Sequence, residues 1–204
     1  DPMLLDHLAV SGETLEQAQS YVEEALGISM RPGGEHAVFH THNKLMGLAD
    51  GLYLEAIAIN PDAPNPDRPR WFDLDRFSGN PRLSNWICRS EALDDEMALL
   101  PEGIGEAVAL QRGDLRWQMV VPASGVLPFD NQCPALIQWQ TAMHPAEMLP
   151  PSGCRLRRLV IAHPQAKELE TAVKKALTDV RVVFEVGPQE LMAEFDTPHG
   201  IRRL

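Results

Sequence analysis

The stretch LMGLADGLYLEAIAIN, residues 45–60, contains two apolar runs separated by a turn signal, LADG. Its second half alternates large and small apolar residues, which is typical of a buried strand, yet Glu55 interrupts it. Tyr53, Glu55 and Ile57 share one face of such a strand. Because a buried, unpaired carboxylate is costly, Glu55 either faces water or is held by a metal, an arginine or a histidine.

The sequence before this stretch predicts a strand and a helix. Residues 4–10 form a short apolar run, and apolar residues then recur at helical spacing from Leu15 to Leu26, with Gly27 as a stop signal. The segments HAVFHTHNKL and GLYLEAIAI follow as strand candidates. We therefore expect residues 3–60 to form a module with the element order β-α-β-β, or with a third strand after the helix.

The same pattern returns twice later in the chain. A proline-rich connector, residues 61–82, is followed by a second module at 83–150, with a hairpin turn at Arg112-Gly113-Asp114. A third, partial βαββ module is expected at 155–204. Three units of about 50 residues indicate internal duplication and an α+β fold.

Composition limits the classes of partner. The chain has 204 residues and a formal charge of −11, and nucleic-acid binding depends on an excess of Lys and Arg. No apolar run approaches the roughly 18 residues that span a bilayer. Cys88, Cys133 and Cys154 are widely spaced, which favours a reducing environment and inert thiols. We expect a cytoplasmic protein that binds neither nucleic acid nor membranes.

Several motifs in order resemble a known family. LDHLAV, THNKLMGLADGLYLEAIAI, PRWFDLDR and RWQMVVPASGVLPFDNQCPALIQWQ together resemble the glyoxalase-like family of the vicinal oxygen chelate superfamily, which includes glyoxalase I, extradiol dioxygenases and fosfomycin-resistance proteins. The resemblance implies that two βαβββ modules pair into a curved, open barrel. It also implies a divalent metal in the cleft, on ligands from the first and last strands of each module.

The resemblance assigns residues of this chain to the metal positions. His7 and Glu55 match the ligand positions of the first module, and Asn85 and Gln138 are their approximate counterparts in the second. Only His7 and Glu55 are strong ligands, Gln138 is a weak one, and Asn85 is poorer still. The cofactor is therefore either a divalent ion (Zn, Ni, Fe, Mn or Mg) or none. Asp6 is expected to point to the opposite strand face from His7.

Histidines recur at alternating positions in the strand candidate HAVFHTHNKL. His36, His40 and His42 would share one strand face, either as a metal site or as a partly solvated edge. His42 and Asn43 lie where the family resemblance is closest. Both could hydrogen-bond a carbonyl or carboxylate of a ligand in the cleft.

Aromatic residues are candidates for the pocket wall. Trp117 and Trp139 each lie in a predicted strand, as core residues or as a platform for a substrate. Gln118 and Gln138 flank them and could supply directional hydrogen bonds to a mostly apolar pocket. The segment PRW at 69–71 is a candidate for one wall of the cleft.

Two functions remain open from the sequence. One is a metal-dependent lyase, isomerase or dioxygenase in which His7 and Glu55 are catalytic. The other is a metal-free module that binds or sequesters a small molecule. The sequence contains no nucleophile elbow, phosphate-binding glycine loop or HExxH helix. A homodimer, paired through the third module, is a further hypothesis.

Overall fold

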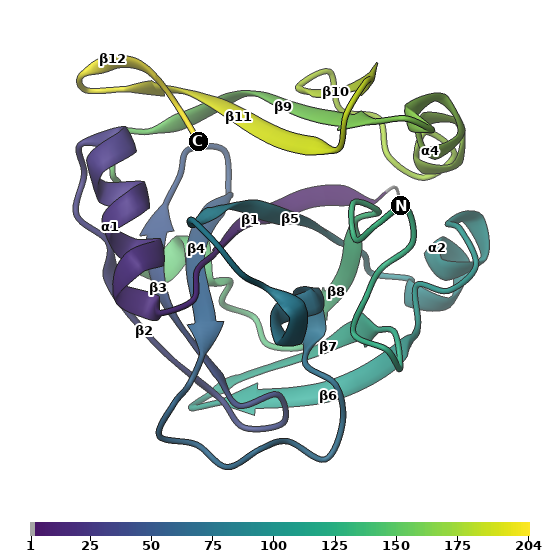
Figure 1. Cartoon of the computed structure of the whole chain (residues 1–204), viewed down its shortest axis with the longest axis horizontal. Coiled ribbons are helices and arrows are strands. Elements are labelled where there is room, and N and C mark those ends of the chain that lie inside the picture. Colours follow the sequence, from purple (N-terminus) through teal and green to yellow (C-terminus); the bar gives the residue numbers. More distant parts are fainter. Residues whose placement is uncertain (1–2) are drawn as a thin grey trace.

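The first part of the chain folds as a β-α-β-β-β unit in the computed structural model, which describes residues 3–204 (Figure 1). β1 pairs in parallel with β4, and β3 and β2 continue from β4 as an antiparallel meander. The helix begins at its cap Thr14 and ends at Gly27, whose φ of 74° suits glycine. The elements are β1 (Leu4–Ser11), α1 (Leu15–Leu26), β2 (Arg31–His36), β3 (Thr41–Gly47) and β4 (Tyr53–Ile59).

The predicted strand HAVFHTHNKL is wrong in detail. β2 ends at His36, a turn follows in which His40 has a φ of 53°, and β3 begins at Thr41. The three histidines therefore do not share a strand. The segment of β2 has the sequence RPGGEH, whose glycines and polar residues carry no strand pattern, so the sequence did not predict it.

The second part of the chain repeats the same pairing. Its last strand, β8, lies parallel to its first, β5, and β7 and β6 continue outward as a meander. The helix α2 again connects the first strand to the meander. These elements are β5 (Arg82–Arg89), α2 (Leu93–Leu99), β6 (Glu106–Arg112), β7 (Leu115–Val121) and β8 (Ala135–Trp139).

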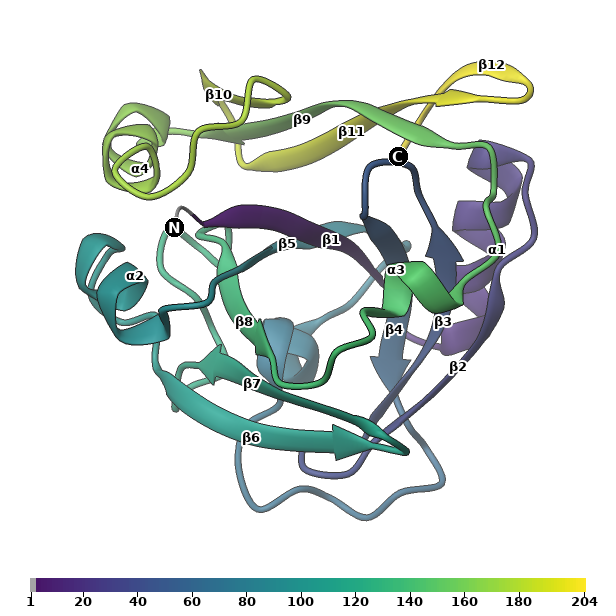
Figure 2. The same cartoon turned by 180° about the vertical axis from the view of Figure 1, so that it is seen from behind.

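β1 and β5 pair antiparallel and join both units into one eight-stranded sheet. The strand order is β2-β3-β4-β1-β5-β8-β7-β6. From the central β1–β5 pair outward, each side has the fourth, the third and then the second strand of its unit. The sheet curls into an open barrel (Figures 1 and 2). The predicted pairing of repeated modules is confirmed. We call β1–β4 the first half-sheet and β5–β8 the second half-sheet.

The third part of the chain has a different topology. Here the first strand after the helix, β10, returns parallel to β9, and β11 pairs with the other edge of β9. The unit has a third strand after its helix, β12, which pairs with β11 as an antiparallel hairpin. It is thus not a copy of the half-sheets. The elements are β9 (Arg155–His163), α4 (Ala166–Val173), β10 (Val182–Val186), β11 (Glu190–Thr197) and β12 (Gly200–Arg203).

This four-stranded sheet forms a separate layer over β1 and β5 (Figures 1 and 2). Trp86 of β5 meets Phe184 of β10 at 6.3 Å between ring centroids, so apolar side chains fill the space between the layers. Cys88, Cys133 and Cys154 are buried and form no disulfide, and burial raises the pKa of each thiol. No helix within residues 3–204 is long and apolar enough to cross a membrane.

Two short helices complete the barrel wall. In the proline-rich connector, η1 (Trp71–Arg76) buries Trp71, which stacks on Phe39 at 4.3 Å and donates its indole N–H to Thr41 Oγ1. α3 (Pro145–Met148) follows β8 and presents Pro145 to the interior. The connector thus forms one wall of the barrel, as the PRW motif indicated.

Candidate active site

The interior of the barrel holds a cavity of about 30 Å³, enough space for about one or two water molecules. The two half-sheets line it differently. The first half-sheet contributes His7, His36, Asn43, Tyr53 and Glu55, and the second contributes Arg112, Trp117, Met119, Ile137 and Trp139.

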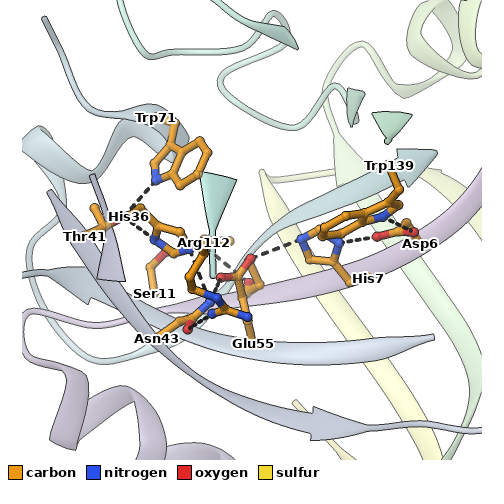
Figure 3. Close-up of polar contacts among 12 residues, drawn as sticks. Asp6, His7, Ser11, His36, Thr41, Asn43, Glu55, Trp71, Arg112 and Trp139 are labelled. Carbon is orange, nitrogen blue, oxygen red and sulfur yellow. Dashed lines mark hydrogen bonds and ion pairs between the residues drawn. The ribbon is translucent and has the colours of Figure 1, made fainter. Parts of the chain in front are cut away.

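His7 and Glu55 face each other in this cavity (Figure 3). The distance between His7 Nε2 and Glu55 Oε2 is 3.1 Å, and both residues are at most 5% exposed. The ring of Tyr53 stacks on the imidazole at 4.3 Å, which fixes its plane. The structure therefore brings together the two residues that the family resemblance assigned as ligands.

Asp6 holds the other side of the imidazole. Its carboxylate lies 2.7 Å from His7 Nδ1, and also accepts hydrogen bonds from His144, Trp139 and Arg89. The prediction that Asp6 points away from His7 is wrong. The β1–β5 register shifts between Leu5 and His7, so Asp6 lies in a bulge where the two-residue alternation of a strand fails.

We call Asp6, His7 and Glu55 the polar array. The charges of these three side chains stabilise one another. Burial alone lowers the pKa of His7, but hydrogen bonds and charge from Asp6 and Glu55 outweigh it and raise that pKa to about 9. Burial raises the pKa of each carboxyl group, yet contact with His7 (and, for Asp6, His144) lowers both below their usual values. Without a bound cation, an imidazolium ion therefore lies between two carboxylates at neutral pH, and a metal ion on Nε2 would displace its proton.

Asn43 extends the array to a second histidine. Its Nδ2 donates to Glu55 Oε1 at 3.1 Å and lies 3.4 Å from His36 Nε2. His36 Nδ1 is 2.8 Å from Thr41 Oγ1. Burial lowers the pKa of His36 to about 4, against the opposing effect of Glu55. His36 is thus neutral and acts as an acceptor for Asn43, which assigns its proton to Nδ1.

Trp117 and Trp139 both line the cavity, where their rings lie 5.4 Å apart. The structure does not bring three other candidates to it. Gln138 lies on the outer face and donates to the Glu91 carbonyl, because its neighbour Ile137 takes the inward position. The other two candidates outside the cavity are His42 and Asn85. His42 points to the opposite face of β3 from Asn43, and Asn85 forms hydrogen bonds with Asn131.

The donor set fits a weakly held cation better than a closed metal site. A carboxylate on Nδ1 of a histidine whose Nε2 faces a second carboxylate is the arrangement that supports metal-binding histidines. Yet residues 3–204 contain no group of three or more His, Cys, Asp and Glu side chains placed to hold a metal ion. His7 and Glu55 would supply two ligands, and water or substrate oxygens the rest.

No curated protein matches the chain. A hypothetical protein from Staphylococcus aureus superposes with a TM-score of 0.61 at 12% identity, over 92% of this chain and 88% of that one. The Mn(II)-bound glyoxalase from Novosphingobium aromaticivorans gives a TM-score of 0.48 at 10% identity, over 98% and 80%. Methylmalonyl-CoA epimerase from Mycobacterium tuberculosis gives 0.43 at 17%, over 68% and 88%.

At 12% identity and a TM-score of 0.61, the Staphylococcus aureus structure shows a shared fold and no more. The stronger finding is a match of residues 5–177 to the family described as the glyoxalase-like domain. This match covers most of the chain and agrees with the motifs and with the paired half-sheets. The chain therefore belongs to the glyoxalase-like domain family.

Proposed function

We propose that this protein is an enzyme that acts on a small molecule inside the barrel, with a divalent cation held by His7 and Glu55. One observation carries the proposal: His7 Nε2 and the Glu55 carboxylate converge at 3.1 Å, while Asp6 occupies the other ring nitrogen. The array lies in the barrel interior, where His7 and Glu55 are at most 5% exposed and electrostatic interactions are stronger than in water.

The protein's own groups have distinct roles in this proposal. Asp6 orients the imidazole, and Asn43 holds Glu55 Oε1 in place. Glu55, when released from the cation, lies within reach of a ligand in the cavity and can take up a proton from a carbon next to a carbonyl. A bound cation would supply Lewis-acid polarisation of that carbonyl, a contribution of several kcal/mol. Lyase, isomerase and dioxygenase reactions all use such polarisation of neighbouring oxygens.

A specific observation favours a second candidate, a metal-free module that binds a small molecule. The inward residues Trp117, Met119, Ile137 and Trp139 of the second half-sheet offer shape and apolar contact but no ligand for a metal. Such a lining suits sequestration of an aromatic or aliphatic molecule. The two candidates differ in whether His7 and Glu55 bind a cation.

Metal analysis of protein purified without chelators separates the two candidates. After dialysis against Mn²⁺ or Zn²⁺, we expect near-stoichiometric divalent metal in the wild type and its loss in both His7→Gln and Glu55→Gln. His163→Gln is the matched control, because His163 is a buried histidine paired with Asp130 at 2.9 Å outside the cavity. A folded wild type that stays metal-free after dialysis against Mn²⁺ or Zn²⁺ would contradict the enzyme proposal and leave the binding module.

A second measurement tests the role of Asp6. Removing the carboxylate that orients a metal-bound histidine weakens metal affinity by about 10–100-fold. Asp6→Asn keeps the shape of the side chain and should produce a loss of that size in a metal titration. An unchanged affinity would show that Asp6 has only a structural role.

A further inference from the structure

The seam where the barrel comes closest to closing contains an arginine that has no carboxylate partner among residues 3–204. β2 and β6 are the two ends of the eight-stranded sheet, and they approach each other there. Arg112, the last residue of β6, extends across this seam to Asn43, with 3.4 Å between Arg112 Nη1 and Asn43 Oδ1 (Figure 3). A residue of the second half-sheet thus reaches the polar array of the first.

Arg112 separates two spaces. On one side is the inner cavity, which is too small for an organic substrate. On the other is an outer groove of about 590 Å³, which Arg112 and Leu115 also line. Met143 and Met148, about half exposed, form part of the groove, and flexible methionines suit a surface that accepts apolar groups of varied shape. A substrate that came through this groove would meet Arg112 before His7.

The guanidinium of Arg112 has little to hold it. The long contact with Asn43 is the one hydrogen bond that its side chain makes within residues 3–204, and no carboxylate in that range lies within 4.0 Å of it. Asp114 lines the same groove but is also beyond that distance. A half-buried guanidinium at a pocket mouth can bind a carboxylate or a phosphate through two parallel hydrogen bonds.

One glycine of β2, Gly34, makes room for this side chain. The β2–β3 register shifts between Pro32 and Glu35, and Gly33 and Gly34 lie in the shift. A Cβ at Gly34 would come within 2.5 Å of Arg112 Cδ, so any side chain there would force Arg112 to move. The present position of Arg112 therefore depends on a glycine in the opposite edge strand.

We propose that Arg112 forms the entrance to the cavity and recognises the substrate as a small organic anion with an apolar body. The side chain moves from Asn43 to pair with the carboxylate or phosphate of the incoming molecule, and this movement opens the inner cavity to the apolar part. The inference deepens the proposed function, since it specifies the substrate class of the same cavity.

The test uses benzoate, phenyl phosphate and the neutral benzamide as probes, with EDTA present so that no metal binds the anions. Binding is followed by tryptophan fluorescence, because Trp117 and Trp139 line the cavity. We expect one or both anions to bind the wild type about tenfold or more tighter than benzamide, as a charge-assisted pair implies. Arg112→Gln should abolish the difference, and Arg116→Gln, at an exposed arginine of β7, should preserve it.

A second variant keeps the arginine and displaces it. Gly34→Ala should reduce the preference for the anion while Arg112 remains in the chain. Equal binding of all three probes, no saturable binding of either anion, or an unchanged preference in folded Arg112→Gln would overturn the inference. The probes are measured without metal. A failure of anion recognition at Arg112 can therefore be distinguished from a failure of metal binding at His7 and Glu55.

Discussion

The two half-sheets have the same strand order but opposite inner surfaces. The first presents His7, Glu55 and Asn43 to the cavity, and the second presents Trp117, Ile137 and Trp139. The difference shows that the barrel requires only the strand pairing and an alternation of buried and exposed residues. The identity of the inward residues is free to differ, and here the inward carboxylate and imidazole groups come from the first half-sheet alone, whereas the second adds a single charged residue, Arg112.

The energetic consequences of the two surfaces differ as well. In the first half-sheet, Asp6 and Glu55 are buried charges that are tolerated because each is hydrogen-bonded to His7 and to further donors. A buried array of charges adds little net stability to the fold. Removing one of its side chains nevertheless destabilises the protein strongly, because the remaining buried charges lose their partner. In the second half-sheet, stability comes from apolar contact and depends on volume.

The largest effect is expected from Asp6→Ala. It removes a fully buried carboxylate that accepts hydrogen bonds from His7, His144, Trp139 and Arg89. We expect a loss of about 3–5 kcal/mol in the free energy of unfolding, measured by urea denaturation. Asp196→Ala is the control, at an exposed pair with Arg157, and should cost less than about 1 kcal/mol. Similar values for the two variants would show that the array is not a coupled unit.

Ile137→Ala tests the apolar half of the cavity. Truncation of this buried side chain should destabilise the protein by about 2–4 kcal/mol, because it leaves a cavity next to Trp139. Metal content should not change, since the residue supplies no ligand. Loss of metal in a folded Ile137→Ala variant would contradict the division of roles between the half-sheets.

His36 makes the stability of the first half-sheet depend on pH. Its pKa of about 4 in the folded protein lies below the ordinary value of 6.5, so the unfolded chain takes up the proton first as pH falls. Its contribution is intact above pH 6.5 and is lost progressively between 6.5 and about 4, by about 1.4 kcal/mol per pH unit. Burial is the main cause of the low pKa of His36. The nearby charge of Glu55 raises this pKa, whereas Arg112, His42 and His7 lower it further.

The comparison with His36→Gln isolates this effect. Chemical denaturation of both proteins across pH 7 to 4 should give a steeper loss of stability in the wild type. If the stability of the two proteins falls in parallel with pH, His36 takes up a proton as readily in the folded protein as in the unfolded chain. That result would contradict a lowered pKa.

The smallest effect is expected from Gln138→Ala. The side chain lies on the outer face of β8 and bonds to a single carbonyl, that of Glu91. We expect a change within about 0.5 kcal/mol in unfolding free energy and an unchanged metal affinity. A loss of metal would restore Gln138 as a ligand and require a different register of β8.

Periodicity and turn signals were sufficient to predict much of the fold. The helix from Leu15 to Leu26 and the hairpin at Arg112-Gly113-Asp114 follow from local patterns, and the structure confirms them. The inward positions of His7 and Glu55 came from the family resemblance. Strand alternation failed at Asp6, where a bulge turns the side chain. The comparison of the two modules failed at Gln138, where a slip of one residue exchanges the two faces of the strand.

The remaining site residues could not be found from local sequence. Arg112 reaches Asn43 only because the curled sheet brings β6 close to β2, and no pattern along the chain encodes that closure. The topology of the third sheet was also hidden, since its element order matches that of the half-sheets while its strand pairing differs. Contacts between distant segments decide both features.

The most direct test of the central claim is anomalous diffraction from crystals grown with Zn²⁺. The account predicts one strong peak within about 2.2 Å of both His7 Nε2 and a Glu55 carboxylate oxygen, with Asp6 still on Nδ1. A cavity without a peak, in which His7 and Glu55 keep their direct hydrogen bond, would contradict it.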